Sequence, residues 1–112
     1  MHEQDIALLE LALQSVERIF EYSKSINNAE EFVNDYKSYD AAMMNFIMLG
    51  ESVGKLSELF KEKNQHIEWG KIYAFRNIIA HDYFGIDEYE VWEIIKTHLP
   101  KLKSDLQKLN KL

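Results

Sequence analysis

The chain contains no cysteine, and its 112 residues include only one proline and four glycines. Without thiols it cannot build a disulfide framework or a thiolate metal site, and thiol redox chemistry is not expected. Stability must therefore come from packing or from oligomerisation. The sequence also lacks any segment in which polar and apolar residues alternate as they do in half-buried strands. Together these absences favour helices over β-structure.

Long apolar runs are missing as well. No stretch approaches the roughly 18 to 20 uninterrupted apolar residues that cross a bilayer, and the first five residues lack the basic and apolar regions of a signal peptide. We therefore expect a cytoplasmic protein without membrane association. With 46% hydrophobic residues, the chain is long enough for one core and too short for two ordinary domains. Residues 1–112 are thus predicted to form a single domain.

Positive charge is also scarce. Nineteen Asp and Glu against 13 Lys and Arg give a net charge of -6, which opposes non-specific attraction to nucleic acid, so RNA binding would need a local basic groove. Only Arg18 and Arg76 carry a guanidinium group. The C-terminal end is rich in lysine, which a solvated helix face explains adequately: Lys96, Lys101, Lys103, Lys108 and Lys111.

Helical periodicity is the clearest pattern that is present. Apolar residues spaced by three and four predict a long helix from about Asp5 to Ser25 and a second from roughly Tyr39 to Lys63. The polar connection between them is expected to hold a short helix around Glu30–Asn34. A third helix should run from Ile67 to Phe84, where Gly85 can end it with a positive φ.

The remaining apolar residues complete a helical bundle. A fourth helix is predicted after Asp87, and Pro100 fits the first turn of a last helix, unless that helix simply continues the fourth with a kink. The predicted fold is therefore an all-α antiparallel bundle of four to five helices. In the second helix, Gly50 and Gly54 are four residues apart and would let a neighbouring backbone approach closely.

The most informative segment runs from Arg76 to Tyr83. Arg76 offers a fixed fork of donors for a phosphodiester, and His81 can exchange protons near neutral pH. In RNA cleavage without a metal, His81 would transfer the proton while Arg76 held the non-bridging oxygens. Asn77 could orient the imidazole or contact phosphate. Tyr83 supplies a hydroxyl that could bind the scissile group or be modified.

On one ideal helix, the side chains of Arg76 and His81 cannot both reach the same phosphate. Arg76 and His81 point about 140° apart. Either the helix distorts near His81, or the side chains curl toward a cleft, or a second copy of the chain completes the site. We favour the second copy, because a two-fold dimer would bring two motifs together and double the local positive charge.

Plainer roles remain open for the same residues. His81 could be a buried histidine that merely satisfies hydrogen bonds, and Arg76 could pair with Glu51, Glu58 or another carboxylate. Glu51 could orient Arg76 or His81, although an ion pair with Lys55 one turn later is the simpler prediction. No metal or other cofactor is predicted, because the other histidines lack the spacing of a helical metal site: His2, His66 and His98.

The same segment carries a family signature. Arg76, His81 and Tyr83 match the R-x4-H-x-Y pattern of the HEPN superfamily, and residues 76–85 resemble in particular the HepT-like toxins. Glu68 departs from the resemblance, because relatives commonly carry Pro before the residue that corresponds to Trp69. The start of the helix that carries the motif could therefore be built differently. The resemblance extends over nearly the whole chain, through the first helix and through short matching steps: Leu49-Gly50-Glu51, Ile67-Glu68-Trp69, Val91-Trp92 and Leu99-Pro100.

The resemblance implies a HEPN helical bundle that forms a homodimer, with the active cleft at the subunit interface. It implies metal-independent endoribonuclease activity through Arg76 and His81, used as the toxin of a toxin-antitoxin pair, with Asn77 as the polar residue that often follows the Arg. The implied partner is a minimal nucleotidyltransferase that attaches AMP to Tyr83, where added charge and bulk would exclude RNA. The alternative is a non-catalytic dimeric HEPN adaptor that binds a nucleotidyltransferase or a nucleotide.

Overall fold

The structure, a computed structural model, describes residues 3–110, so His2 and Lys111 lie outside the described residues. The described chain consists of helices joined by short turns, and no strand occurs in this range. The all-α prediction is therefore confirmed. Not one of the described helices combines the length and the apolar character that crossing a membrane would require.

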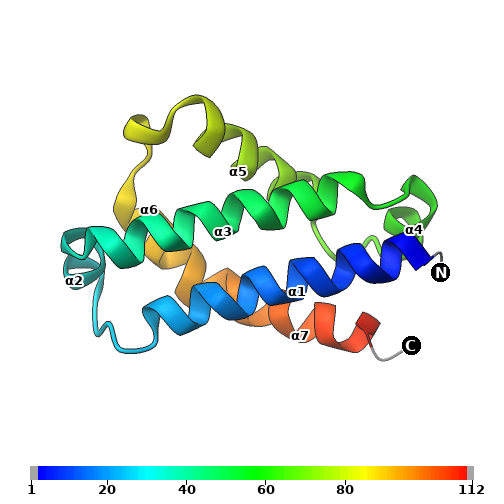
Figure 1. Cartoon of the computed structure of the whole chain (residues 1–112), viewed down its shortest axis with the longest axis horizontal. Helices are drawn as coiled ribbons and strands as arrows, with labels where there is room; N and C mark the ends of the chain where they lie inside the picture. The colour runs from blue at the N-terminus through cyan, green and yellow to red at the C-terminus, as the bar shows by residue number, and fades with distance from the viewer. Residues whose placement is uncertain (1–2, 111–112) are drawn as a thin grey trace.

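Four longer helical stretches form the bundle. Helix α1 (Glu3–Ser23) lies antiparallel to α3 (Tyr36–Lys55), and α5 (Trp69–His81) packs against α3 and runs antiparallel to it (Figure 1). Helix α7 (Leu99–Asn110) packs against α1. Helix α3 thus lies at the centre and contacts both α1 and the helix that carries the motif. The shorter helices are α2 (Ala29–Asn34), α4 (Glu58–Lys63) and α6 (Glu88–Glu93).

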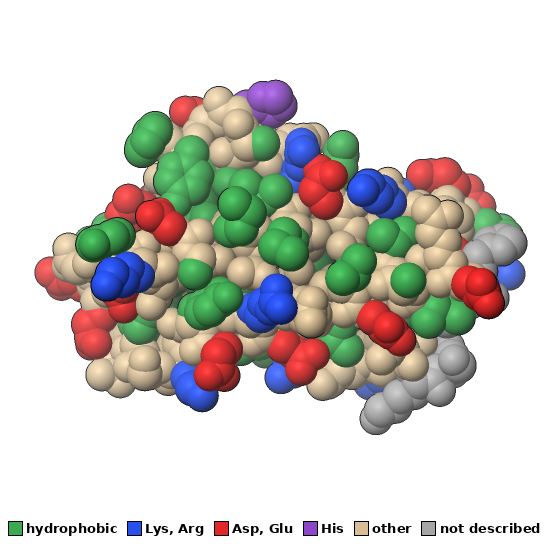
Figure 2. All heavy atoms as spheres, viewed as in Figure 1, with side chains coloured by type: hydrophobic (Ala, Val, Ile, Leu, Met, Phe, Trp, Pro, Cys, Tyr) green, Lys and Arg blue, Asp and Glu red, His purple; other side chains and the backbone are tan. Residues whose placement is uncertain are grey.

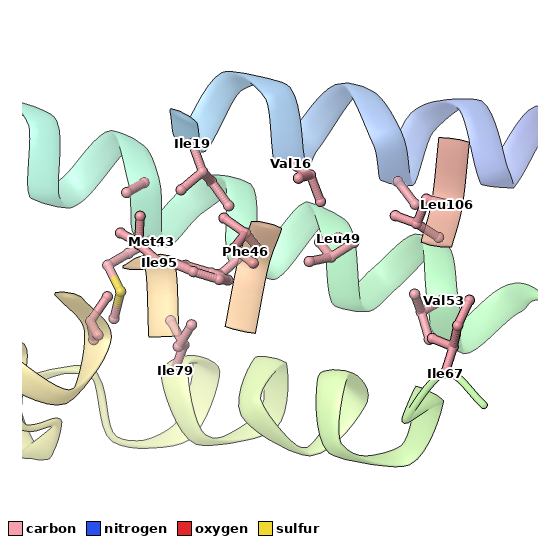
Figure 3. Packing of buried hydrophobic residues seen from close by; sticks show 14 of the residues in the cluster. Val16, Ile19, Met43, Phe46, Leu49, Val53, Ile67, Ile79, Ile95 and Leu106 are labelled. Atoms are coloured by element: carbon pink, nitrogen blue, oxygen red, sulfur yellow. The ribbon is translucent and has the colours of Figure 1, made fainter. Parts of the chain in front are cut away.

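The core lies where these helices meet. Figure 3 shows apolar side chains of α1 and α3 pointing toward one another, with Ile79 of α5 and Leu106 of α7 closing the cluster. Val16, Leu49 and Ile79 are all buried, as their positions on apolar stripes predict. Burial of these stripes is the main term that stabilises the bundle.

The second long helix is shorter than predicted, because it does not run on to Lys63. Helix α3 ends at Lys55, Leu56 is extended, and Ser57 caps the separate helix α4 by accepting a hydrogen bond from Phe60 N. A distant residue also holds this break: the buried carboxylate of Asp5 accepts hydrogen bonds from the backbone N (2.9 Å) and Oγ (2.7 Å) of Ser57. The apolar spacing continues across this break, so periodicity alone could not reveal it. The first helix and the short helix α2 are confirmed.

The motif helix is also shorter than predicted at both ends. It begins at Trp69 and ends at His81, and the Tyr83–Gly85 segment forms a separate 3-10 turn. The expected positive φ at Gly85 is wrong, since no described glycine has one. The nearest atom to a Cβ placed on this glycine would be Oδ2 of Asp82, at 2.2 Å, and that exposed side chain can move away.

The last two predicted helices form one continuous stretch. After α6, residues Ile94–His98 form a single π-helical turn, and α7 follows directly. The N–H of Leu99 donates to the carbonyl of Ile94, five residues back. Pro100 has no N–H and crowds the preceding turn, and a local widening of the helix relieves that crowding. The structure therefore matches the alternative in which the fifth element continues the fourth.

Candidate active site

The motif helix lies unusually close to α3 at one point. A Cβ atom on Gly50 would stand 2.2 Å from the Cβ of Arg76, and one on Gly54 would stand 2.6 Å from the ring of Tyr73. Both glycines therefore allow the close approach that the sequence predicts. Because Gly50 precedes Glu51, this contact also brings a carboxylate of α3 next to the arginine.

The guanidinium of Arg76 is held on two sides. Its Nη2 lies 2.5 Å from Oε1 of Glu51, and its Nη1 donates to Oδ1 of Asn77 at 2.9 Å. The Arg76 side chain is 26% exposed and that of Glu51 is 43% exposed. Arg76 Nε is buried and has no hydrogen-bonding partner among residues 3–110. Since guanidinium carries five N–H donors, two Nη donors remain for an incoming anion.

His81 is the last residue of α5, and its side chain is exposed to solvent. The alternative in which His81 is buried is therefore wrong. Helix α5 is regular up to this residue, so it does not bend to bring His81 toward Arg76. Within one chain the two residues belong to different parts of the surface: Arg76 faces α3, while the imidazole lies at the free end of the helix.

Tyr83 follows on the 3-10 turn and is anchored to α3. Its hydroxyl donates a hydrogen bond to the carboxylate of Asp40, and its ring lies edge-on to that of Tyr39, with 6.2 Å between the ring centroids. Burial, and then the hydrogen bond to Asp40, raise the pKa of the Tyr83 hydroxyl above its usual value. The phenol therefore keeps its proton through neutral pH.

The side chains of four of the five predicted site residues thus fall into two groups, and His81 belongs to neither. Arg76, Glu51 and Asn77 form one cluster, whereas Tyr83 pairs with Asp40. Glu51 pairs with Arg76 and not, as the simpler prediction had it, with Lys55. Sequence reasoning missed Asp40, because it lies 43 residues before Tyr83 and no local pattern links them.

The tip of the turn after the motif is an exposed aromatic ring. Phe84 is 97% exposed, and its ring packs against that of Tyr83 with 5.5 Å between the centroids. Other large apolar side chains of α3 and α5 are also exposed, and Figure 2 shows hydrophobic side chains gathered on the face over these two helices. The site therefore lies beside an apolar surface that single-chain packing does not cover.

The known proteins that resemble this chain are named as ribonucleases. A profile of the family described as "Ribonuclease HepT-like" matches residues 12–109. The chain is 32% identical over 108 residues to "Putative RNase MJ1380" of Methanocaldococcus jannaschii. The match covers 96% of this chain and 98% of that relative. It is 30% identical over 103 residues to "Probable ribonuclease HepT" of Thermococcus cleftensis, covering 92% and 93%.

A longer relative contains a similar segment. The chain is 34% identical over 97 residues to "Gamma-glutamylcyclotransferase and putative RNase MJ0434" of Methanocaldococcus jannaschii; the match covers 87% of this chain but only 43% of that protein. No solved structure matches the chain. The family profile covers most of the sequence and includes the whole Arg76–Tyr83 segment. The chain therefore belongs to the ribonuclease HepT-like family.

Proposed function

We propose that this chain is a metal-independent endoribonuclease that acts as the toxin of a toxin-antitoxin pair, cutting RNA through Arg76 and His81 in a cleft between two copies. The observation that carries the proposal is the fixed guanidinium of Arg76. It is held by Glu51 and Asn77 on a helix that ends, five residues later, in an exposed imidazole. Membership of the ribonuclease HepT-like family supports the same reaction.

The proposed chemistry divides between these two residues. His81 takes the proton of the 2′-hydroxyl or delivers one to the leaving 5′ oxygen, while the free Nη donors of Arg76 bind the non-bridging oxygens. Asn77 and Glu51 are positioning residues, since both hold the guanidinium. Two copies would supply two imidazoles, one as the base and one as the acid.

A homodimer is supported by the apolar surface beside the site. Met44, Met48, Tyr73 and Ile78 are all exposed on α3 and α5, where a monomer leaves them in water. Burying such side chains between two copies stabilises association. A two-fold axis near α5 would also bring the His81 of one copy toward the Arg76 of the other, which a single helix does not achieve.

We further propose that a minimal nucleotidyltransferase neutralises the protein by attaching AMP to Tyr83. In that step the Tyr83 oxygen bonds to the α-phosphorus of ATP, pyrophosphate leaves, and the hydroxyl proton passes to Asp40. The hydrogen bond from Tyr83 to Asp40 supports this assignment, because the carboxylate already accepts a hydrogen bond from the hydroxyl that would lose its proton. The attached phosphate would repel RNA from the neighbouring site.

The decisive experiment is cleavage of total RNA and defined transfer RNAs in EDTA, with product ends identified. The unmodified chain should cut and leave 2′,3′-cyclic phosphate ends, while Arg76→Ala and His81→Ala should both lose cutting and growth inhibition. Far-UV circular dichroism and sedimentation confirm that each variant is folded and has the same oligomeric state. Retained cutting by clean His81→Ala protein would overturn the mechanism.

The alternative is the non-catalytic dimeric adaptor. In that case a folded, unmodified dimer would cut none of the RNAs, yet would bind a minimal nucleotidyltransferase or a nucleotide tightly. Isothermal titration calorimetry with the purified partner separates the two functions, because the adaptor needs binding without cleavage.

A further inference from the structure

A concave site lies on another part of the motif helix. It is a cavity of about 370 Å³ between α5, the loop before it, the π-helical turn and the start of α7. None of Arg76, Asn77, His81 and Tyr83 is among its described lining residues. Its volume falls at the lower end of the range of small-molecule pockets. The cavity is therefore separate from the proposed nuclease site.

The inner part of the cavity is apolar. Helix α5 packs mainly on α3, and α7 mainly on α1, so the facing sides of α5 and α7 leave space between them. Ring contacts hold one wall, since Phe75 packs edge-on against Phe46 with 5.2 Å between the centroids. An apolar molecule would replace water along this inner surface, which is lined by Phe46, Leu49, Ile72, Phe75, Ile94 and Leu102.

Basic side chains outnumber acidic ones along the polar edge of the cavity, where two lysines and two histidines stand against Glu68 and Asp105. Each of its two carboxylates already has a lysine: Lys71 Nζ lies 2.7 Å from Glu68, and Lys101 Nζ lies 3.0 Å from Asp105. The hydrogen bond from Lys71, with the charges of that lysine and of further basic groups nearby, lowers the pKa of Glu68. Glu68 thus stays ionised, and each of the two carboxylates faces a lysine.

Two histidines complete this polar edge. His66 comes from the loop before α5, and His98 comes from the π-helical turn, and both line the cavity with exposed side chains. In the part of the chain that the structure describes, neither imidazole has a hydrogen-bonding partner. A neutral imidazole can donate one N–H to an anion. A protonated imidazole can donate two, and its charge repels a cation. Single π turns inside helices frequently occur at functional sites.

We propose that this cavity binds a small amphipathic anion, with its apolar body against Phe46 and Phe75 and its head group beside His66 and His98. The head group is a carboxylate, sulfonate or phosphate, because basic side chains outnumber carboxylates at this edge and their N–H groups donate to an anion. The small volume and the few donors select a molecule with a single aromatic or short aliphatic body and one charged end. The site does not depend on the proposed nuclease function.

The test uses the fluorescent probe anilinonaphthalene sulfonate, which has an aromatic body and one anionic group, on the full chain. We expect saturable binding with one probe per chain. Decanoate should displace it, whereas decyltrimethylammonium, which has a similar tail and the opposite charge, should not. Displacement by the cation would overturn the assigned ligand class, and binding that does not saturate would overturn the site.

Two variants locate the probe. Ile72→Trp fills the cavity, and His98→Glu places a negative charge at its edge on an exposed position, so the fold is retained in at least the second; each should weaken binding by about tenfold or more. Met44→Lys, on the exposed apolar face, and His81→Ala are the matched controls and should bind the probe as the unmodified chain does. Equal binding by His98→Glu, or loss of binding in Met44→Lys, would show that the probe sits elsewhere and would overturn the proposal.

Discussion

Gly50 of α3 and Arg76 of α5 meet with no room for a Cβ atom between them. The backbone of one helix thus lies directly against the side chain of the proposed phosphate-binding residue. The Gly50→Ala variant should push α5 outward and lower the free energy of unfolding by about 1–3 kcal/mol. The rate of RNA cleavage should fall by more than the loss of folded protein explains, because a displacement of about 1 Å at a catalytic group can lower the rate on the order of 100-fold.

The matched control is Gly70→Ala on α5, the helix that Gly50 contacts. A Cβ atom at Gly70 would meet nothing within 4 Å, so this change should stabilise the helix by roughly 0.5–1 kcal/mol and leave cleavage unchanged. Urea unfolding and RNA cleavage measure both effects. A Gly50→Ala protein that cleaves at the unmodified rate would show that the close contact is not required.

Glu51 is predicted to act through Arg76. Glu51→Ala removes the partner of Nη2 and should lower kcat/KM for RNA by about tenfold, whereas Glu51→Gln retains a hydrogen-bond acceptor and should lose less. Stability should change by under about 1 kcal/mol, because the pair is partly exposed. Rates on a fluorogenic RNA give the comparison. A faster Glu51→Ala enzyme would mean instead that the carboxylate obstructs the RNA.

The exposed apolar face should hold the two copies together. Met44→Lys combined with Met48→Lys places two charges on α3 and should convert the dimer to monomer, with loss of cleavage. Leu59→Lys is the control, because Leu59 is about as exposed as Met44 but lies on α4. Sedimentation equilibrium reports the mass. A double variant that stays dimeric would place the interface on another face.

Asp40 should accept the proton of Tyr83 during modification. With a minimal nucleotidyltransferase, ATP and Mg²⁺, Asp40→Asn should gain AMP about tenfold more slowly than the unmodified chain, and Tyr83→Phe should gain none. Glu17→Gln, an exposed acid on α1, is the control and should react at the normal rate. Intact mass spectrometry follows the adduct. Equal rates for Asp40→Asn would remove its proposed role.

The buried ring of Tyr39 should make the protein sensitive to alkali. Burial, reinforced by the charges of Glu88, Asp40 and Asp87, raises the pKa of Tyr39 to about 12. Between pH 10 and 12 the unfolded chain loses this proton while the folded chain keeps it. Unfolding free energy should therefore fall by roughly 2–3 kcal/mol over this range.

The control for this effect is a change that removes the hydroxyl. Tyr39→Phe should flatten the fall in stability between pH 10 and 12, whereas Tyr36→Phe, at an exposed position, should leave it unchanged. Urea midpoints measured by circular dichroism across this range decide the matter. Parallel curves for Tyr39→Phe and the unmodified chain would contradict the prediction.

The sequence predicts the parts of the fold that depend on neighbours along the chain. Apolar spacing reveals α1 and most of α3 because a helical stripe is a local pattern. The sequence offers Glu51 as one of several possible partners of Arg76. Gly50 indicates where the two helices can touch. Asp40 had no such signal, because its bond to Tyr83 exists only after α3 and the turn have come together. Contacts decided by tertiary structure leave no periodic trace.

The bond between Asp5 and Ser57 makes the boundary between two helices depend on a third. The two residues are 52 positions apart, yet the carboxylate of one takes the backbone N–H that would otherwise extend α3 toward α4. In a fragment without the first helix, only the local cap of Ser57 on Phe60 N would hold this break. The docking of α1 therefore sets the length of its neighbour, so secondary structure here is a product of assembly rather than its starting point.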